Sequence, residues 1–518
     1  MQLIDFFDAA AMREPNRIAF VQPDGATLTY AESAAAVQAI ASALQGAGVP
    51  QGSRIAVYSP NDARAFLVML AVLRVGGIWV PLNARNSVAD NIAFLLSTEA
   101  TVLFYHGQFE AEVAQLRAAA PALALCVCLD GPGRAGPALA AFQARAAGPV
   151  AALPEDRLRP CNILATGGTT GRSKGAVWTN LTWQTLVASF WTSTPAVRHP
   201  VHLCVAPMTH GAGVLALTLL THAPTNILMT SADPAAILDA IERHRVTHLF
   251  LPPTVLYALL ASPLLRQRDT SSLVVFLISA APVSSDKLRE AVAALGPVMH
   301  QSWGQAEAPF FLTFLTAEDH ARAVADEAAG ELLRSCGRPT MFSRVEIMSD
   351  DGKLLPPREL GEIVARSDLV MPGYYNDPVA TAAVSQHGWH HTGDVGFKDE
   401  AGYVFIVDRK RDMIISGGFN VFSTEVEERV LAHPAVQDCA VIGVPDEKWG
   451  EAVKAVVELK PGAEATSDEL IAHCRAALGG IKTPKSVEIW ETLPRSPVGK
   501  VLKRAIRERF WTGRDRAV

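Results

Sequence analysis

The sequence has little of several features that mark specialised classes of protein. Only seven of its 518 residues are cysteine, and the one close pair, Cys126 and Cys128, lacks the spacing of a zinc site. Free, buried thiols in a reducing compartment are therefore expected. The longest apolar stretch, residues 66–80, is interrupted by Arg74 and two glycines, so no membrane span is expected. The first residues lack the pattern of a secretory signal, and a cytoplasmic location is expected.

Charged residues are also scarce, at 19% of the sequence against about 25% in typical soluble domains. Lys and Arg number 46 and Asp and Glu 52, which gives a net charge of −6. This balance lacks the basic field of a nucleic-acid-binding protein, so no nucleic acid is expected as a partner. Apolar residues make up 49%, which excludes a disordered chain. What remains is a globular protein long enough to bury a substantial core.

Short apolar runs alternate with helical patterns through most of the chain. A run at 54–58 is followed by a helical pattern at 63–75 and a second run at 78–81. Further runs of the same kind lie at 202–207, 246–251, 272–279 and 403–407. Apolar runs between helices are typical of parallel sheets buried on both faces. The expected fold class is therefore α/β.

A charged segment at 408–412 indicates a change of domain, because new strand and helix patterns begin beyond it. Thr424 and Glu427 have the spacing of a capping box, which predicts a helix start there. We expect a large N-terminal domain of mostly parallel sheets covered by helices at 1–409. A small, mobile α+β domain is expected at 410–518.

The strongest local signal is a glycine-rich segment at 166–175, directly after an apolar run. Glycines leave backbone amides free to turn toward an anion, hydroxyls can donate to phosphate oxygens, and a lysine adds positive charge. The segment is not a Walker A loop, because Ser173 separates Arg172 from Lys174. The candidate phosphate-binding residues are Thr166, Gly167, Gly168, Thr169, Thr170, Gly171 and Lys174.

A second glycine pattern, at 131–136, matches the G-x-G-x-x-G of dinucleotide-binding folds. Pro132 and Pro137 suit a helix-opening turn poorly, so a loop is the favoured interpretation. The surrounding residues 115–155 are rich in Ala and Pro and are interpreted as a surface excursion. A nicotinamide-dependent dehydrogenase is the alternative that this pattern raises, and a titration without NAD binding would exclude it.

The phosphate loop resembles that of the adenylate-forming enzymes, which include acyl-CoA synthetases, aryl-CoA ligases, luciferases and peptide-synthetase adenylation domains. The family's loop reads T-S-G-T-T-G-x-P-K-G, and Gly167 and Ser173 depart from it. Other segments resemble the family's motifs and follow in the family's order. These segments are 279–282, 301–307, 392–394, 408–412, 416–421, 443–451 and 494–500. The chain is thereby identified as a member of the family's acyl-CoA synthetase branch.

The resemblance implies a site for ATP and magnesium. Gln301 would face the edge of the adenine, Trp303 would flank the base, and Glu307 would hold Mg²⁺, a cation that prefers oxygen ligands. Asp394 would accept the ribose hydroxyls, with Arg409 nearby. The remaining nucleotide contacts would come from Ala280, Ala281, Pro282, Ser302, Gly304 and Gln305.

The resemblance also implies a moving small domain that serves two half-reactions. It would rotate about Arg411, and Lys500 would bridge the substrate carboxylate and the α-phosphate during adenylation. The residues facing coenzyme A would be Ser416, Gly417, Gly418 and Trp449. Ala306 stands where the family usually has threonine, so one hydroxyl contact to phosphate is missing.

The acyl substrate is expected to be an uncharged, hydrophobic monocarboxylic acid that is fatty, alicyclic or aryl. By resemblance, His210 would neighbour its carboxylate, and the acyl pocket would comprise His210, Gly211 and Phe310. The 207–213 segment carries no aspartate that could bind an ammonium group, and the residues after Glu307 are apolar. The expected catalytic set is Lys500, Glu307, Lys174 and His210, and the expected product is acyl-CoA.

Two alternatives to an acyl-CoA synthetase stay open. One is an adenylating enzyme that loads a carrier-protein thiol instead of free CoA, against which Trp449 and residues 416–421 count. The other is a non-catalytic protein that binds nucleotide or acyl-adenylate, suggested by Ala306 and Ser173. Oligomeric state also stays open, with a homodimer as one option.

Overall fold

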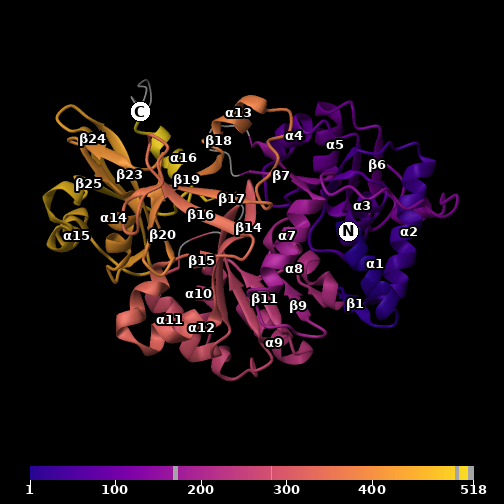
Figure 1. The fold of residues 1–518 in the computed structure, drawn as a ribbon, viewed down its shortest axis with the longest axis horizontal. Helices are drawn as coiled ribbons and strands as arrows, with labels where there is room; N and C mark the ends of the chain where they lie inside the picture. The colour runs from indigo at the N-terminus through magenta and orange to yellow at the C-terminus, as the bar shows by residue number, and fades with distance from the viewer. Residues whose placement is uncertain (167–172, 280, 282, 496–500, 512–518) are drawn as a thin grey trace. The chain divides into compact units, whose positions relative to one another are not determined.

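The computed structural model describes residues 1–166, 173–279, 281, 283–495 and 501–511 (Figure 1). The chain forms two compact units. The large unit comprises residues 1–345 and 365–390, and the small unit comprises 346–364 and 391–518. Among the helices in the described ranges, none has both the length and the apolar character needed to cross a bilayer.

A six-stranded sheet forms the first half of the large unit. Its strands are β3 (Arg54–Tyr58), β4 (Ile78–Leu82), β5 (Val102–Tyr105), β6 (Leu125–Cys128), β7 (Pro160–Ala165) and β8 (Gly175–Thr179). They run in the order β6-β5-β3-β4-β7-β8, and every neighbouring pair is parallel except β7 and β8. The helices of this part are α1 (Leu3–Arg13), α2 (Tyr30–Gly46), α3 (Ala63–Arg74), α4 (Val88–Ser97), η1 (Gly107–Phe109), α5 (Glu110–Ala119) and α6 (Leu139–Gln143).

A nine-stranded sheet forms the second half of the large unit. Its strands are β1 (Ile18–Val21), β2 (Thr27–Thr29), β9 (Val201–Cys204), β10 (Thr225–Leu228), β11 (His248–Leu251), β12 (Val275–Ile278), β13 (Met299–Gln305), β14 (Ala308–Leu315) and β15 (Arg338–Pro339). They run in the order β15-β14-β13-β12-β11-β9-β10-β1-β2, with parallel pairing from β13 to β1. The carboxyl ends of β12 and β13 therefore lie at the same edge of the sheet.

Further helices complete the large unit. They are α7 (Asn180–Trp191), α8 (Gly211–Thr218), η2 (Leu219–His222), α9 (Pro234–His244), α10 (Pro253–Ala261), η3 (Pro263–Arg266), α11 (Ser285–Leu295), α12 (Ala317–Ala325), η4 (Glu327–Arg334) and α13 (Pro378–Ala383). Apolar residues of α9, α10, α11 and α12 share one core with Leu203, Leu249 and Phe276 of the sheet. Burial of these apolar side chains is the main contribution to the stability of this helix-and-sheet layer.

A five-stranded sheet consists of β16 (Ser343–Met348), β17 (Gly361–Ser367), β18 (Ser385–Gln386), β19 (Trp389–Lys398) and β20 (Val404–Arg409). The division between the units falls within β16, β17 and β19. The compact small unit thus includes segments on the amino-terminal side of the predicted 409/410 domain boundary. The predicted boundary at 409/410 marks the start of the part that is expected to move, which is a different property from compactness. It therefore stays a prediction.

The carboxyl-terminal part of the small unit is an α+β arrangement. Its strands are β21 (Ile414–Ser416), β22 (Phe419–Val421), β23 (Val436–Asp446), β24 (Gly450–Leu459) and β25 (Ser486–Trp490). Its helices are α14 (Ser423–Leu431), α15 (Ser467–Lys482) and α16 (Lys503–Glu508). Val426 and Val430 of α14 pack with Val441 of β23 and Val453 of β24 in one core.

The predicted fold class is confirmed, and so are the strands expected at 54–58, 78–81, 202–207, 246–251, 272–279 and 403–407, with ends that shift by no more than three residues. The interpretation of 115–155 as a surface excursion is wrong. Residues 125–128 form β6, which pairs with β5, and Cys126 and Cys128 are buried free thiols. The strand was missed because it is short and the residues around it are rich in Ala and Pro.

Two smaller predictions can also be judged. Residues 131–136 form a loop, as predicted, and α6 begins only at Leu139. A Cβ on Gly136 would lie 1.8 Å from the carbonyl oxygen of Cys126, so this glycine permits close packing on β6. The capping box of Thr424 and Glu427 is wrong, because α14 begins at Ser423 and has Phe422 as its N-cap residue.

Candidate active site

The base of the predicted phosphate loop is a closed hairpin between β7 and β8. The amide of Thr166 donates to the carbonyl of Lys174 at 2.8 Å. The hydroxyl of Ser173 donates back to the carbonyl of Thr166 at 2.5 Å. Ser173, a departure from the family's proline, thus contributes a hydrogen bond that proline could not make. Gly167, Gly168, Thr169, Thr170 and Gly171 lie outside the described residues.

Lys174, Tyr374 and Glu307 come together beside this hairpin. The Nζ atom of Lys174 lies 4.9 Å from the centroid of the Tyr374 ring. The Tyr374 hydroxyl donates to Oε1 of Glu307 at 2.6 Å. Burial, and then the Glu307 carboxylate, raise the pKa of the Tyr374 phenol far above its ordinary value, so this hydroxyl remains a donor. A cation, a neutral hydrogen-bond donor and a carboxylate therefore lie in a row in space, next to the base of the loop.

Tyr374 was not among the residues predicted for the site. Its only local signal is an aromatic pair, Tyr374 and Tyr375, directly after a Pro-Gly turn. The partner Glu307 lies 67 residues away in the sequence, so no spacing rule connects the two. Lys174 and Glu307 were both expected in the site, and the structure places them on either side of this tyrosine.

Glu307 stands in the tight turn between β13 and β14. The indole Nε1 of Trp178 donates to the carbonyl of Ala306 at 2.7 Å, and the amide of Met371 donates to the carbonyl of Glu307 at 2.8 Å. The Ala306 side chain packs against an apolar cluster that includes Tyr374. The turn is thus held from two sides, which fixes the position of the Glu307 carboxylate.

Glu307 fits the expected role of a magnesium ligand. Across the described residues, no group of three or more His, Cys, Asp or Glu side chains gathers as a metal cage. Mg²⁺ is commonly held by one or two carboxylates together with substrate phosphates, so a cage is not required. Glu307 Oε2 accepts no hydrogen bond within the described part of the chain and can serve as that single ligand.

The predicted adenine-binding residues lie along β13. Oε1 of Gln301 is buried and has no hydrogen-bond partner among the described residues, which suits an atom that meets a ligand. The hydroxyl of Ser279 donates to the carbonyl of Ser302 at 2.9 Å and so ties the end of β12 to β13. A Cβ on Gly304 would lie 2.5 Å from the amide nitrogen of Phe310, so no side chain fits there.

The other residues expected around the base are placed as follows. Trp303 is buried, with 9% of its surface exposed. Gln305 Oε1 lies 3.4 Å from Nε2 of His390. Ala281 follows the end of β12, whereas Ala280 and Pro282 lie outside the described residues.

The expected acyl-binding residues form an aromatic cluster at the start of α8. His210 precedes the helix, and its Nδ1 lies 3.0 Å from the hydroxyl of Thr209. A Cβ on Gly211 would lie 2.3 Å from the ring of Phe250. The rings of Phe250 and Phe310 meet edge to face with centroids 5.7 Å apart. Burial lowers the pKa of His210 to about 4, so it is a neutral imidazole at pH 7.

In the small unit, the two residues expected near the ribose contact each other. Arg409 Nε lies 2.6 Å from Oδ1 of Asp394. Asp394 is almost fully buried, while the Arg409 side chain is partly exposed. The carbonyl of Arg411, the expected hinge, accepts a hydrogen bond from Arg507 at 3.3 Å.

The residues expected to face coenzyme A also lie together in the small unit. Gly417 adopts a positive φ of 59°, and its amide donates to the carbonyl of Trp449 at 2.8 Å. A Cβ there would lie 2.6 Å from the Trp449 ring, so glycine is required by both backbone and space. Lys448 and Lys485 lie 5.0 and 5.7 Å from the centroid of that ring.

The flanking CoA-facing positions show why this segment holds its shape. Ser416 is buried and pairs with Gly450 across β21 and β24, and Gly418 has a φ of 81°. Lys500 lies outside the described residues, so its side chain is not placed.

Comparison with known proteins identifies the family. The sequence pattern of "AMP-binding enzyme" matches residues 7–375, and that of "AMP-binding enzyme C-terminal domain" matches residues 425–500. A feruloyl-CoA synthase from Amycolatopsis is 38% identical over 498 residues, with 95% of each chain covered. The long-chain-fatty-acid–CoA ligase FadD13 of Mycobacterium tuberculosis is 33% identical over 509 residues, with 96% of each chain covered.

A similar solved structure is that of the amide bond synthetase McbA from Marinactinospora thermotolerans. It superimposes with a TM-score of 0.88 at 32% identity, covering 98% of this chain and all of the other. The sequence patterns span both predicted domains, and the similar chains match almost end to end. The chain therefore belongs to the AMP-binding enzyme family, in its branch of acid–thiol ligases of the acyl-CoA synthetase type.

Proposed function

We propose that this enzyme activates a hydrophobic monocarboxylic acid as acyl-AMP, with release of pyrophosphate, and then transfers the acyl group to coenzyme A. The observation that carries the proposal is the group formed by Lys174, Tyr374 and Glu307 at the base of the phosphate loop. It supplies a cation for phosphate and a carboxylate for a phosphate-bound magnesium ion. Family membership supplies the reaction class.

The first half-reaction brings two anions together, so charge neutralisation and positioning decide its rate. An oxygen of the substrate carboxylate attacks the α-phosphorus of ATP, and the bond from that phosphorus to the bridging oxygen of pyrophosphate breaks. Lys174 would stabilise the phosphates, and Glu307 would hold magnesium, which neutralises their charge when it is bound. Lys500 would approach the carboxylate and the α-phosphate from the small domain.

The second half-reaction replaces AMP with a thiol. The sulfur of CoA attacks the acyl carbon, and AMP leaves with the oxygen that joined it to the acyl group. For this step the small domain would rotate about Arg411, withdraw Lys500 and present Ser416, Gly417 and Gly418. Such a rotation is a hinge motion between two working states.

Free CoA is proposed as the acceptor because of the surroundings of Trp449. Its ring is partly exposed and has lysine ammonium groups within 6 Å, from Lys448 and Lys485. An aromatic ring with adjacent cations suits a nucleotide that carries phosphates. The phosphopantetheine arm of a carrier protein has no base to stack there.

The proposed acyl group is uncharged and apolar. Phe310, expected in the acyl pocket, packs edge to face on Phe250, and the expected His210 is neutral, so none of these three side chains would pair with a second charge. Similar enzymes are named for both aryl and fatty acids, as in feruloyl-CoA synthase and FadD13. Edge-to-face packing favours aromatic rings, so aryl acids are the first substrates to test.

The test is acid-dependent release of pyrophosphate and AMP from ATP and Mg²⁺, with and without CoA, over fatty, alicyclic and aromatic acids. Products are identified by mass. Acyl-CoA from one class of acid is the expected result. Pyrophosphate release without CoA consumption would indicate another acceptor, and ATP binding without release for any acid would indicate a binding protein.

One further acceptor belongs in the assay. The similarity to the amide bond synthetase McbA gives a specific reason to include an amine arm. An amide formed faster than the thioester would replace the second half of the proposal and leave the adenylation half unchanged.

A further inference from the structure

Two ion-pair anchors flank the segment that contains Lys500. The first is Arg495, five residues before it. One terminal nitrogen of its guanidinium lies 2.6 Å from Oδ2 of Asp438, and the other lies 2.9 Å from Oε2 of Glu458. Asp438 and Glu458 lie on the neighbouring strands β23 and β24, so this guanidinium joins the segment to the central sheet of the small unit.

The two ends of the segment are also joined to each other. Arg495 and Val501 form an antiparallel bridge, and the amide of Leu502 donates to the carbonyl of Pro494 at 2.8 Å. Arg495 and Val501 therefore lie next to each other at one fixed place on the small unit. Any movement of this base would move the attachment of Lys500 with it.

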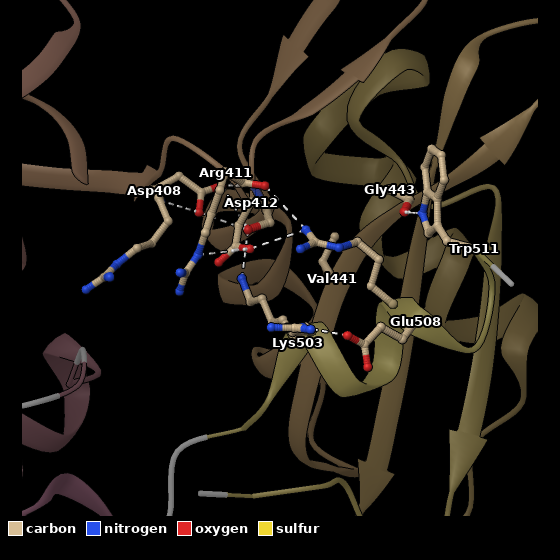
Figure 2. Close-up of polar contacts among 12 residues, drawn as sticks. Asp408, Arg411, Asp412, Val441, Gly443, Lys503, Glu508 and Trp511 are labelled. Carbon is tan, nitrogen blue, oxygen red and sulfur yellow. Dashed lines mark hydrogen bonds and ion pairs between the residues drawn. The ribbon is translucent and has the colours of Figure 1, made fainter. Parts of the chain in front are cut away.

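The second anchor is Lys503, three residues after Lys500 and the first residue of α16 (Figure 2). Its Nζ atom lies 2.8 Å from Oε1 of Glu427 and donates to the hydroxyl of Ser423 at 2.7 Å. Only 20% of the Lys503 side chain and 14% of the Glu427 side chain are exposed. An ion pair this enclosed is screened little by water, so it can hold a backbone position that a surface pair could not.

Asp408 extends this anchor to the charged segment at 408–412. Its carboxylate accepts hydrogen bonds from the amide and the hydroxyl of Ser423, the residue that Lys503 also contacts. Burial opposes the charge of Lys503, but the carboxylates of Glu427, Asp408 and Asp412 outweigh it, so the pKa of Lys503 is raised. The ammonium group is therefore charged at neutral pH.

A second residue of α16 contacts the same charged segment. Arg507 donates to the carbonyl of Arg411 at 3.3 Å and lies 3.4 Å from Oδ1 of Asp412. Helix α16 thus contacts the expected hinge with one residue and the start of α14 with another. The chain beyond Lys500 is fixed to the elements about which the small domain would turn.

We propose that Lys503 is a positioning residue for adenylation, which holds the carboxyl-terminal end of the 496–500 segment through Glu427 and Ser423 while Arg495 holds the other end. The proposal rests on the proposed function, because it assigns Lys500 to the first half-reaction. Lys503 itself contacts no substrate. Its removal should slow the half-reaction that uses Lys500 and leave the other nearly unchanged.

The test measures the two half-reactions separately. Adenylation is followed as acid-dependent pyrophosphate release without CoA, and thioester formation is followed from supplied acyl-adenylate and CoA. Lys503→Met alone leaves Glu427 buried without its partner, so the main variant is the pair Lys503→Met with Glu427→Gln, which removes both charges. Arg504→Met is the matched control, because Arg504 lies on the same helix in a more exposed pair with Glu508.

We expect the paired variant to lose about 100-fold in the kcat of adenylation, the size of effect that a small misplacement of a reacting group produces. Thioester formation should change by less than about threefold, and Arg504→Met should change neither half. Unchanged adenylation in a folded paired variant would overturn the proposal. Equal loss of both half-reactions would overturn it as well, because it would indicate a purely structural role.

Lys500→Ala separates failure of this inference from failure of the proposed function. If Lys500→Ala loses adenylation and the Lys503 pair does not, only the positioning role is wrong. If Lys500→Ala keeps adenylation, the assigned role of Lys500 is wrong, and the inference that depends on it is wrong too.

Discussion

The two compact units bury polar side chains in opposite forms. The large unit encloses four histidines, each with no more than 2% of its surface exposed: His202, His248, His300 and His320. The small unit instead encloses charged pairs, such as Lys503 with Glu427 and Lys398 with Glu346. Its own histidines, at 391, 433 and 473, are only partly buried.

The buried histidines of the large unit are neutral. His202 and His248 are direct neighbours on β9 and β11, and His248 lies near the rings of Phe190 and Trp191. Burial lowers the pKa of His202, His300 and His320 to about 4. Burial, followed by the neighbouring histidines, lowers the pKa of His248 to about 3.

The contrast separates two uses of a buried polar group. A neutral imidazole with one hydrogen bond, like that of His202 to Asn226 at 3.0 Å, can pack in an apolar core at modest cost. A buried ion pair costs more desolvation and needs a fixed geometry, so it specifies position more than it adds stability. The anchors around 496–500 are of the second kind, in the unit expected to move.

Removal of one partner from such a pair should give the largest effect. Lys503→Met alone leaves the Glu427 carboxylate without its cation, and the small unit should lose about 3–5 kcal/mol of unfolding free energy. Hydrogen exchange of α14 and β23, compared with that of the large unit, measures the loss where it occurs. The added Glu427→Gln change should restore most of it, and a loss of less than about 1 kcal/mol in the single variant would contradict the buried pair.

Acid should destabilise the large unit, because its buried histidines are neutral in the folded state. Below the unfolded pKa of about 6.5, the unfolded chain binds protons that the four buried histidines do not bind. Stability of the large unit should therefore fall as the pH falls from about 6.5 to about 4, by at most about 3 kcal/mol per histidine. The small unit should respond less in this window.

The measurement is the urea concentration at which each unit is half unfolded, between pH 7 and pH 4.5. Hydrogen exchange is the probe, because it reports on the two units separately. His320→Gln removes one titrating group and keeps a donor for the Thr316 carbonyl, so it should reduce the pH slope of the large unit. A slope that His320→Gln leaves unchanged would show that the acid sensitivity lies elsewhere.

A smaller effect is expected at the candidate site of the large unit, where charge would serve the proposed reaction. Tyr374→Phe keeps the ring beneath Lys174 and removes the hydrogen bond to Glu307. A hydrogen bond of this kind is worth about 0.5–1.5 kcal/mol, or about 2- to 12-fold. We expect a change of that size in kcat/KM for ATP and in the Mg²⁺ concentration required. Tyr375→Phe, one residue further along, is the control and should leave both unchanged.

Local patterns predicted much of this fold, and contacts distant in sequence were the part they missed. The strands at 54–58 and 78–82 were predictable because a run of apolar residues between helical patterns is a local property. Tyr374 was not, because its role comes from Glu307, far away in the chain. The short strand β6 was missed because the Ala- and Pro-rich residues around it dominate the composition.

The start of α14 is another place where a contact distant in sequence overrides a local pattern. A substitution there should give the smallest change in stability of those predicted. Thr424 and Glu427 have capping-box spacing, but Asp408, from the end of β20, supplies the carboxylate at this helix end. Glu427 turns away to accept from the amide of Val441 at 2.7 Å and to pair with Lys503. Thr424 adds one long hydrogen bond to Asp408, at 3.3 Å.

Thr424→Ala should therefore cost less than about 0.5 kcal/mol, well below the roughly 1 kcal/mol of a true N-cap residue. Asp408→Asn is the matched comparison and should cost more, since it weakens both bonds to Ser423 and removes a charge that stabilises Lys503. Hydrogen exchange of the first turn of α14 measures both changes. If Thr424→Ala instead costs as much as Asp408→Asn, the helix start depends on its own sequence, and the contact with the 408–412 segment matters less than the geometry indicates.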